Sequence, residues 1–318
     1  IRAGVGSLPD DLSTLPGGRF STGAAINGHG VIVGSSEVQT GPLQWVVHAF
    51  VSTAPGSISD LGVLPFGTDS HATGINDNGL IVGFGGVAGP DGLVTRAFLA
   101  TANTKPAELG LFDGGRNSRA EGVNTNGQVV GSADDANGVF HAFLATGNGP
   151  LVNLGGLAGG DGSSYGLGLN NRGVVVGRAG IGGGYQAFRS RPDNTLQPLG
   201  FLSGTVSSSA EAVNDTGVIV GNSTFASGAS LAFLYTDADG MVDLNKLISN
   251  GSGWMLHSAS GINNSGQIVG TGTFDGQVHA FRLDPLLTAV PEPSTLTLAA
   301  TGLGLAWAAA RWRRRVRP

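Results

Sequence analysis

The chain has 318 residues, of which 56 are Gly and none is Cys. The lack of Cys excludes disulfides, thiolate metal sites and Cys nucleophiles. The formal net charge is −5, from 17 Lys and Arg against 22 Asp and Glu; five Arg and one Glu lie after residue 290, so the preceding residues carry 12 basic and 21 acidic side chains. Such an acidic body has no general electrostatic attraction for nucleic acid, and we expect no nucleic-acid partner.

A short motif recurs six times along the chain. Its second copy, residues 74–83, reads GINDNGLIVG: a small residue, an apolar residue, Asn, two variable residues, Gly, a short apolar run and Gly. The Asn residues of successive copies are 44 to 49 residues apart, and a period of this length predicts a repeat architecture. These Asn residues, for which we predict a structural role in turns, are Asn27, Asn76, Asn124, Asn170, Asn214 and Asn263.

Each repeat predicts four short strands in a fixed order. The first ends at the Asn, the second is the apolar run after the turn Gly, the third carries Ala-Phe, as at residues 97–98, and the fourth carries Leu, usually before Gly, as at residues 109–110. Short segments rich in β-branched and aromatic residues between Gly, Asn, Asp and Ser are typical of strands. We expect a type I turn with a G1 bulge at each Asn, and a second strand that is buried on both faces.

Four antiparallel strands in about 45 residues are the content of one propeller blade. We therefore predict an all-β fold, a β-propeller of six four-stranded blades over residues 1–285. Leu12 lies 15 residues before Asn27, which is the spacing from Leu61 to Asn76, and the last repeat ends without its own Leu-Gly segment. We expect the N-terminal segment, residues 10–15, to supply the fourth strand of the last blade and to close the ring.

The tail differs in composition from the repeats. Residues 286–294 form a linker that contains the Pro-Glu-Pro motif, residues 295–310 contain no charged side chain, and residues 311–318 contain five Arg. We predict a short transmembrane helix over 295–310, although a full span takes about 20 residues. The Arg cluster predicts a cytoplasmic C-terminus, with the body on the other side of the membrane. The alternative, a buried core helix, is disfavoured because the adjacent Arg side chains are costly to bury.

Two sets of polar side chains recur at fixed positions of the repeat. Either set invites a functional reading, as a metal site or as a ring of carboxylates that binds cations or a sugar. We favour structural roles, because equivalent positions on different blades are spread around the ring, and no spacing sets up a general acid and base. The residues are His48, His141 and His279 before Ala-Phe, where other copies have Arg96, Gln186 and Leu231, and Asp11, Asp60, Glu108 and Asp243 before the fourth-strand Leu.

Other ionisable residues give weaker signals. Asp237 and Asp239, like the pair Asp134 and Asp135, resemble calcium loops but lack the bidentate Glu. We therefore predict no catalytic, cofactor or metal site and keep Ca²⁺ as an alternative. The remaining histidines share no repeat position and are interpreted as surface or packing residues: His29, His71 and His257.

The repeat resembles the bacterial extracellular repeats called HAF repeats, over residues 10–285. The resemblance depends on His-Ala-Phe at residues 48–50, 141–143 and 279–281, followed in the repeat by Leu-Gly and the Asn motif. It implies an exported bacterial protein and provides no catalytic residues to transfer. Three of the six copies depart from the pattern at the His position.

The end of the chain, residues 290–318, resembles the PEP-CTERM sorting signal of Gram-negative bacteria. Pro-Glu-Pro, an apolar segment and a terminal Arg cluster occur in the expected order. The resemblance implies recognition and cleavage by an exosortase, a membrane-bound sorting enzyme, followed by attachment or release at the cell surface. The residues that match the signal are Pro291, Glu292 and Pro293, with Arg311, Arg313, Arg314 and Arg315.

We expect an exported, non-catalytic repeat protein that acts as a structural or binding module of the cell envelope or extracellular matrix. Its association with exopolysaccharide and biofilm is implied only by the sorting-signal family. We expect a monomer, anchored in the inner membrane by its C-terminus before processing and located afterwards at the surface or in the matrix. The alternatives are a propeller glycan hydrolase or lyase and a repeat protein with only a spacer role. The start at Ile1 fits either a removed signal peptide or a fragment.

Overall fold

The computed structural model describes residues 11–54, 56–249 and 252–285. It divides into two compact units, Ile1–Leu283 and Asp284–Pro318. The predicted transmembrane helix, the Pro-Glu-Pro motif and the Arg cluster lie outside the described residues. No helix in the described part of the chain is both long and apolar enough to cross a bilayer.

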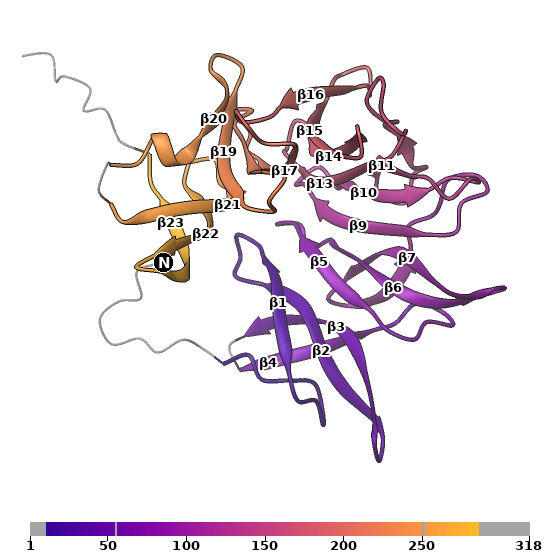
Figure 1. Ribbon diagram of the computed structural model, residues 1–318. Coiled ribbons are helices and arrows are strands. Elements are labelled where there is room, and N and C mark those ends of the chain that lie inside the picture. The colour runs from indigo at the N-terminus through magenta and orange to yellow at the C-terminus, as the bar shows by residue number, and fades with distance from the viewer. Residues whose placement is uncertain (1–10, 55, 250–251, 286–318) are drawn as a thin grey trace, which may run out of the picture. The chain divides into compact units, whose positions relative to one another are not determined.

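The first unit consists of six antiparallel β-sheets, one for each repeat (Figure 1). Sheet 1 contains β1 (Ser21–Ile26), β2 (Ile32–Gly41), β3 (Gln44–Ala54) and β4 (Ser57–Gly62); sheet 2 contains β5 (His71–Ile75), β6 (Ile81–Gly89), β7 (Gly92–Thr101) and β8 (Thr104–Glu108). Sheet 3 contains β9 (Ser118–Val123), β10 (Gln128–Asp134), β11 (Phe140–Thr146) and β12 (Val152–Asn153); sheet 4 contains β13 (Ser164–Leu169), β14 (Val175–Ile181), β15 (Gly184–Ser190) and β16 (Leu196–Gly200). Sheet 5 contains β17 (Ser207–Val213), β18 (Ile219–Thr224), β19 (Ser230–Thr236) and β20 (Gly240–Asp243), followed by the 3₁₀ helix η1 (Leu244–Lys246); sheet 6 contains β21 (Trp254–Ile262), β22 (Ile268–Phe274) and β23 (Gln277–Leu283).

Within every sheet the strands follow one another in chain order, so each repeat is a meander of adjacent hairpins. The prediction of an all-β chain built from six antiparallel units is confirmed. Sheet 6 has three strands among the described residues, whereas the other sheets have four. The predicted N-terminal strand is not seen over residues 11–15. In sheet 1 the fourth strand ends at Gly62, and the position equivalent to Gly62 is Ser13, so an equivalent strand would cover residues 8–13, half of which lie outside the described part.

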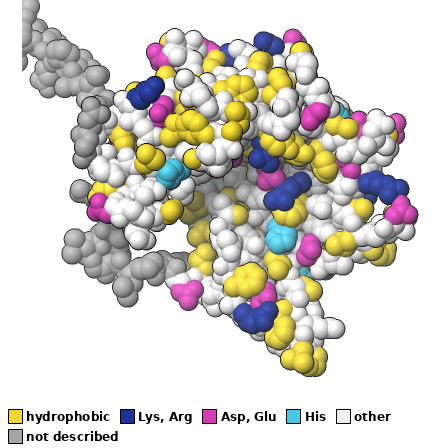
Figure 2. Space-filling view, in the orientation of Figure 1, with side chains coloured by type: hydrophobic (Ala, Val, Ile, Leu, Met, Phe, Trp, Pro, Cys, Tyr) yellow, Lys and Arg dark blue, Asp and Glu magenta, His cyan; other side chains and the backbone are white. Residues whose placement is uncertain are grey.

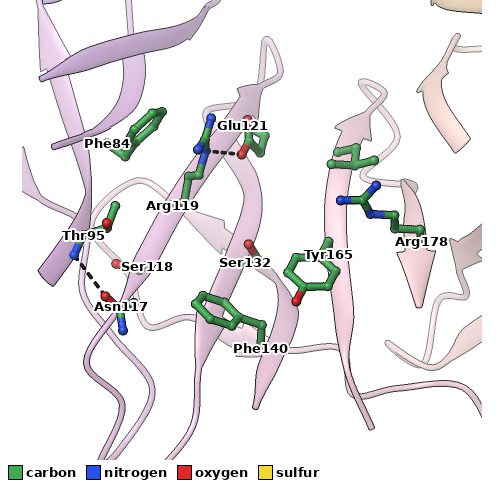
Figure 3. A pocket seen from close by; sticks show the side chains of 11 residues that line it. Phe84, Thr95, Asn117, Ser118, Arg119, Glu121, Ser132, Phe140, Tyr165 and Arg178 are labelled. Carbon is green, nitrogen blue, oxygen red and sulfur yellow. Dashed lines mark hydrogen bonds and ion pairs between the residues drawn. The ribbon is translucent and has the colours of Figure 1, made fainter. Parts of the chain in front are cut away.

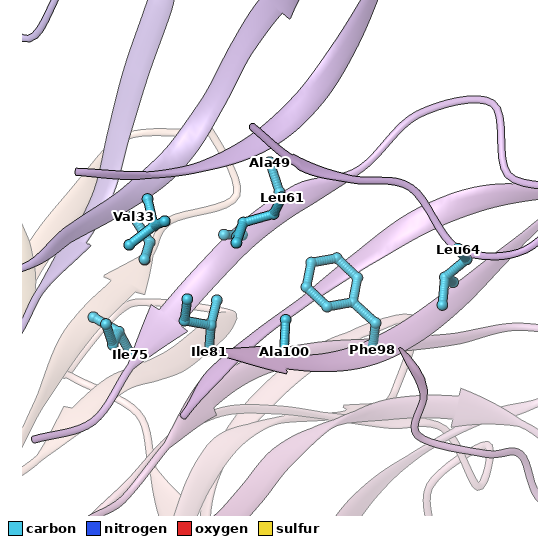
Figure 4. Close-up of a cluster of buried hydrophobic side chains, with 10 residues drawn as sticks. Val33, Ala49, Leu61, Leu64, Ile75, Ile81, Phe98 and Ala100 are labelled. Atoms are coloured by element: carbon cyan, nitrogen blue, oxygen red, sulfur yellow. The ribbon is translucent and has the colours of Figure 1, made fainter. Parts of the chain in front are cut away.

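The hydrophobic core lies between the faces of successive sheets. In the cluster drawn in Figure 4, Val33 and Leu61 from sheet 1 pack against Ile81 and Phe98 from sheet 2. The apolar runs of the second strands are buried in sheets 2 to 5, as predicted, and β10 has the pattern of a strand covered on both faces. In sheet 6 the prediction is wrong, because β22 alternates buried and exposed residues. The Phe of the Ala-Phe pair is fully buried in the first five sheets: Phe50, Phe98, Phe143, Phe188 and Phe233.

The Gly that ends each apolar run is required by close packing. A Cβ atom on Gly131 would lie 2.0 Å from the carbonyl oxygen of Arg119 and 2.8 Å from Cζ of Phe143. The buried Phe ring therefore rests against backbone that only Gly allows to come so near.

The Asn motif forms the same turn in every sheet. In sheet 2 the Gly79 N–H donates to the Asn76 carbonyl at 3.0 Å, the Asn76 N–H donates to the Leu80 carbonyl at 3.1 Å, and Gly79 has a φ of +79°. This is the expected type I turn closed by Gly in the left-handed region. The turn ends the first strand of each sheet, so all six turns lie at the carboxyl ends of the first strands.

The six turns are also joined to one another. The Nδ2 group of each Asn donates to the main-chain carbonyl of the Asn in the next sheet, and we call this series the Asn ladder. Its five hydrogen bonds run from Asn27 to Asn76 (3.1 Å), Asn76 to Asn124 (2.8 Å), Asn124 to Asn170 (2.9 Å), Asn170 to Asn214 (3.0 Å) and Asn214 to Asn263 (3.2 Å). At the end of the series, Asn263 donates instead to Oε1 of Gln267 at 2.8 Å.

Candidate functional site

The Asn turns line a shallow depression of about 310 Å³ at the carboxyl ends of the first strands. Its polar atoms are already engaged: Oδ1 of Asn124 accepts from the N–H groups of Asn126 and Gln128 at 3.0 and 2.9 Å, while its Nδ2 serves the ladder. Such groups satisfy backbone and have little capacity left for a ligand. The geometry of this end of the molecule is therefore that of a structural support.

A second cavity, of about 490 Å³, lies near the amino ends of the first strands (Figure 3). Its walls come from β9 and β13, with contributions from β6, β7, β10, β11 and β14. The residues that line it include Phe84, Arg119, Glu121, Phe140, Tyr165 and Arg178. In Figure 2, basic, acidic and His side chains lie together near the middle of the face shown. We call this cavity the aromatic-arginine cavity.

The strand pattern explains why these side chains meet. Arg119 lies five residues before Asn124 and Glu121 three residues before it, so both point to the same face of β9. Tyr165 occupies the same place relative to Asn170 on β13. Because β9 and β13 are the first strands of neighbouring sheets, their side chains converge on one space.

One wall of the cavity is a cluster around Arg119. Its guanidinium lies 3.7 Å from the ring centroid of Phe84 and forms an ion pair with Glu121 at 2.6 Å. Phe84 also stacks on His71, with 5.0 Å between ring centroids. Burial raises the pKa of Glu121 although Arg119 acts against the shift, and burial lowers the pKa of His71. Within this cluster the charges of Arg119 and Glu121 neutralise each other.

The opposite wall is built around Arg178. Its guanidinium lies 5.5 Å from the ring centroid of Tyr165 and 4.8 Å from that of Tyr185. Tyr165 stacks on Phe140 at 5.9 Å, and burial raises the pKa of its hydroxyl, with Tyr185 adding to the effect. The Nε atom of Arg178 is buried and has no hydrogen-bond partner among the described residues. The Arg178 guanidinium therefore lies over two Tyr rings, and its Nε–H group lacks an acceptor among the described residues.

In sheets 1 and 2 the two predicted sets of repeated polar positions are partners of each other, whereas His141 in sheet 3 contacts Asp135, with 3.4 Å between Nε2 and Oδ2. In sheet 1, Nδ1 of His48 lies 2.9 Å from Oδ2 of Asp60 on the neighbouring strand. In sheet 2, Arg96 replaces the His and pairs with Glu108 at 2.9 Å. Burial opposes ionisation of Asp60, but the hydrogen bonds with His48 and the Gly62 N–H hold its pKa below the usual value.

The acids before the fourth-strand Leu also stabilise local backbone. Oδ1 of Asp11 accepts from the Ser13 N–H at 2.8 Å, and Oδ1 of Asp243 accepts from the Asn245 N–H at 2.9 Å. This is the side-chain turn that Asp and Asn commonly form at the ends of strands. Each of these acids therefore contacts neighbouring groups of its own segment or sheet, and the described contacts do not direct them towards a shared ligand.

The possible calcium ligands lie in separate local contacts. Asp237 pairs with Arg189 at 2.7 Å, and Asp239 accepts from the Thr236 hydroxyl at 2.8 Å. Asp134 accepts from Asn117, and Asp135 from the Val139 N–H. In the described part of the chain, no group of three or more His, Asp or Glu side chains has the geometry to hold a metal ion.

The aromatic-arginine cavity was not predicted from the sequence. His71 was interpreted as a surface or packing residue, and Arg119, Glu121, Tyr165 and Arg178 were not singled out. A signal exists in the alignment of the repeats: these positions differ from copy to copy, whereas the flanking Asn and Gly do not. The residue five before the Asn is in turn Thr22, His71, Arg119, Tyr165, Ser209 and Ser258.

A family model described as the PEP-CTERM protein-sorting motif matches residues 289–315. The match supports the predicted sorting signal and indicates an exported protein that an exosortase processes from a membrane-anchored precursor. No curated protein matches the chain significantly. The comparisons therefore assign a sorting signal to the tail and leave the six sheets to be interpreted from their own geometry.

Proposed function

We propose that the six sheets form a closed six-bladed propeller of the HAF type, and that this propeller is a non-catalytic binding module sorted to the cell envelope or extracellular matrix. The observation that carries the proposal is the combination of a sorting signal at the end of the chain with a cavity lined by aromatic and charged side chains in the described part of the repeats. A non-catalytic protein at the cell surface would act by binding a ligand or by separating other components of the envelope.

The closure of the propeller is supported by a second repeated contact between sheets. A buried Ser at the start of a first strand joins it to the preceding sheet: the Ser208 hydroxyl accepts from the Ala187 N–H at 2.9 Å and donates to the Gly200 carbonyl at 2.7 Å. Ser70, Ser118 and Ser164 do the same. We call this contact the Ser bridge.

Ser21 has half of a Ser bridge. It occupies the same repeat position, and its hydroxyl donates to the Ser13 carbonyl at 2.7 Å, as the other serines donate to Gly. Ser13 has a φ of +66°, close to the +75° of Gly62. The missing half would be an Ala N–H from the last sheet. Ala280 holds the equivalent place on β23, where it is exposed, whereas Ala49, Ala97, Ala142, Ala187 and Ala232 are fully buried.

The closure can be tested with Ser21→Ala. In a closed propeller this change removes an acceptor from the buried Ala280 N–H and lowers the unfolding free energy by about 1–2 kcal/mol. Deletion of residues 1–15 lowers the melting temperature for the same reason. An unchanged melting temperature in both variants would show that the first and last sheets do not pair.

The binding role is supported by the composition of the cavity. Its lining contains one carboxylate, Glu121, held by Arg119, whereas glycoside hydrolases commonly use two carboxylates across the scissile bond. The rival role, a glycan hydrolase or lyase, makes a distinct prediction: incubation with a bound glycan releases shorter products. A bound glycan recovered intact supports the binding module.

The sorting proposal is tested by Glu292→Ala in a bacterium that has an exosortase. Pro291 and Pro293 fix φ on either side of Glu292, which suits binding of an extended backbone by a protease. We expect the variant to accumulate as the unprocessed precursor in the membrane fraction, and Thr288→Ala, outside the matched residues, to be processed normally. Normal processing of Glu292→Ala would overturn the proposal.

A further inference from the structure

The aromatic-arginine cavity contains one cation that its own side chains leave unneutralised. Arg119 and Glu121 neutralise each other at 2.6 Å. Arg178 lies over the faces of Tyr165 and Tyr185, and its buried Nε has no acceptor among the described residues. Leaving a charged donor buried without an acceptor is unfavourable, and an incoming oxygen anion removes that penalty. Since Arg119, Arg178 and Glu121 are the charged groups of the lining, the cavity has a net charge of about +1.

This balance selects the kind of anion. The planar guanidinium fork matches a carboxylate through two parallel hydrogen bonds. A monoanion suits a site with one free cation, whereas a doubly charged phosphate would leave an uncompensated charge near Glu121. The residues that line the cavity lie mainly on β-strands, whereas phosphate sites are usually formed by successive backbone N–H groups of a turn.

The rest of the lining indicates what carries the carboxylate. Phe140 and Tyr165 stack side by side and give an apolar wall, while Ser132 and Glu121 offer polar atoms. A volume of about 490 Å³ falls in the usual range of small-molecule sites, roughly 300–1,000 Å³. The cavity therefore suits a small ligand that has one carboxylate, one apolar face and several hydroxyl groups. A uronic acid has these features.

We propose that the aromatic-arginine cavity binds a uronate unit of an acidic polysaccharide, with the carboxylate on Arg178 and the sugar ring against Tyr165 and Phe140. This inference rests on the proposed binding function and names its ligand. The pairing of Arg119 with Glu121 orders the facing wall. A neutral sugar lacks the group that satisfies Arg178, and an inorganic anion lacks the face that packs on the aromatic wall.

The test measures binding of a fluorescently labelled trigalacturonate to the full chain by polarisation. We expect saturable binding, binding at least about tenfold weaker for a neutral trisaccharide of the same length, and no competition by inorganic phosphate. Arg178→Gln should weaken trigalacturonate binding at least about tenfold, and Arg178→Lys should restore only part of it because Lys lacks the planar fork.

Arg189→Gln is the matched control. Arg189 also lies over a Tyr ring, 5.7 Å from Tyr235, but it is paired with Asp237 at 2.7 Å and lies outside the cavity. We expect its binding to be unchanged. If Arg178→Gln fails to fold, as judged by its melting temperature, Tyr165→Ala and Arg178→Lys supply the comparison.

Three outcomes would overturn the assignment. Unchanged binding in Arg178→Gln would remove the site while leaving the binding module intact, with its ligand bound elsewhere. Competition by phosphate at the concentration of the uronate would show a general anion site. Absence of binding to any glycan would count against both this assignment and the proposed binding function, whereas the sorting proposal is decided separately by processing of Glu292→Ala.

Discussion

At their carboxyl ends the six first strands run into the same Asn turn, whereas near their amino ends the residue five before the Asn varies among the copies, with only Ser occurring twice. The turn end needs one geometry six times, because every hairpin and every contact to the next sheet has the same backbone groups to satisfy. Near the amino end the Ser bridge recurs six residues before the Asn, but the next position along the strand has no such repeated role. Repetition therefore identifies the residues that hold the sheets together, and variation within the repeat identifies where a ligand can be recognised.

The largest expected effect comes from the repeated Gly. Gly131→Ala would place a Cβ atom 2.0 Å from a backbone oxygen, and we expect a loss of about 3 kcal/mol or more in unfolding free energy because neither backbone nor Phe143 can yield cheaply. Urea unfolding followed by circular dichroism measures it. Gly23→Ala is the control, since its Cβ would meet only Ile32 Cγ2 at 3.7 Å. A loss of unfolding free energy in Gly131→Ala as small as that in Gly23→Ala would show that the repeated Gly is not required for packing.

The next effect tests the Asn ladder. Asn124→Ala leaves the N–H groups of Asn126 and Gln128 without their acceptor and removes the bond to Asn170, so we expect a loss of about 2–3 kcal/mol. In Asn263→Ala the loss should be about 1 kcal/mol or less, because that side chain is exposed and makes no ladder bond onward. Urea midpoints compare the two. Equal losses would mean that the ladder contributes nothing beyond the turn itself.

A smaller effect is expected at the Ser bridge. Ser208→Ala removes one acceptor and one donor between sheets 4 and 5, at a side chain that is 1% exposed, and should cost about 1–2 kcal/mol. Ser163→Ala, which loses only an exposed contact to Asp161, should be neutral within about 0.5 kcal/mol. If the two variants have the same melting temperature, the bridge does not hold the sheets together.

The smallest effect is expected at the variable end. Burial raises the pKa of Glu121 above 4.5, so the folded protein holds this proton more tightly than the unfolded chain does. The contribution of Glu121 to stability is therefore fully present below about pH 4.5 and is lost as pH rises through the folded-state pKa. As pH rises through the folded-state pKa of Glu121, the Glu121→Gln variant should gain less than about 1 kcal/mol of unfolding free energy relative to the unsubstituted protein. A difference that is flat from pH 4 to 7 would contradict the role of burial.

Much of the fold is encoded in short stretches and could be predicted. The turn at Asn76 depends on four consecutive residues, the last of which is Gly79 at positive φ. The strands depend on the local alternation of apolar and polar residues. The partnership of His48 with Asp60 was missed, because residues 12 apart pair only when the register of β3 and β4 is known. The two sets were therefore treated separately, although in sheets 1 and 2 their members lie on paired strands of the same hairpin.

The candidate site could not be predicted because no local stretch contains it. Phe84, Arg119, Tyr165 and Arg178 come from three successive sheets, and each is an ordinary strand residue in its own segment. Their convergence depends on how neighbouring repeats stack, which strand periodicity does not describe. Aligning the repeats would have shown that these positions vary among the copies, and that sheets 2 to 4 carry large aromatic or charged side chains there.

The Asn ladder has a direction: each copy donates to the copy that follows it and never to the copy before. Each copy thus brings a donor for its successor and an acceptor for its predecessor, which is a head-to-tail contact. A tandem duplication of one repeat in the gene would deliver both halves of every such contact at once. The architecture can therefore gain or lose copies by recombination without any compensating substitution at the joint, and the variable end of each new copy is free to diverge.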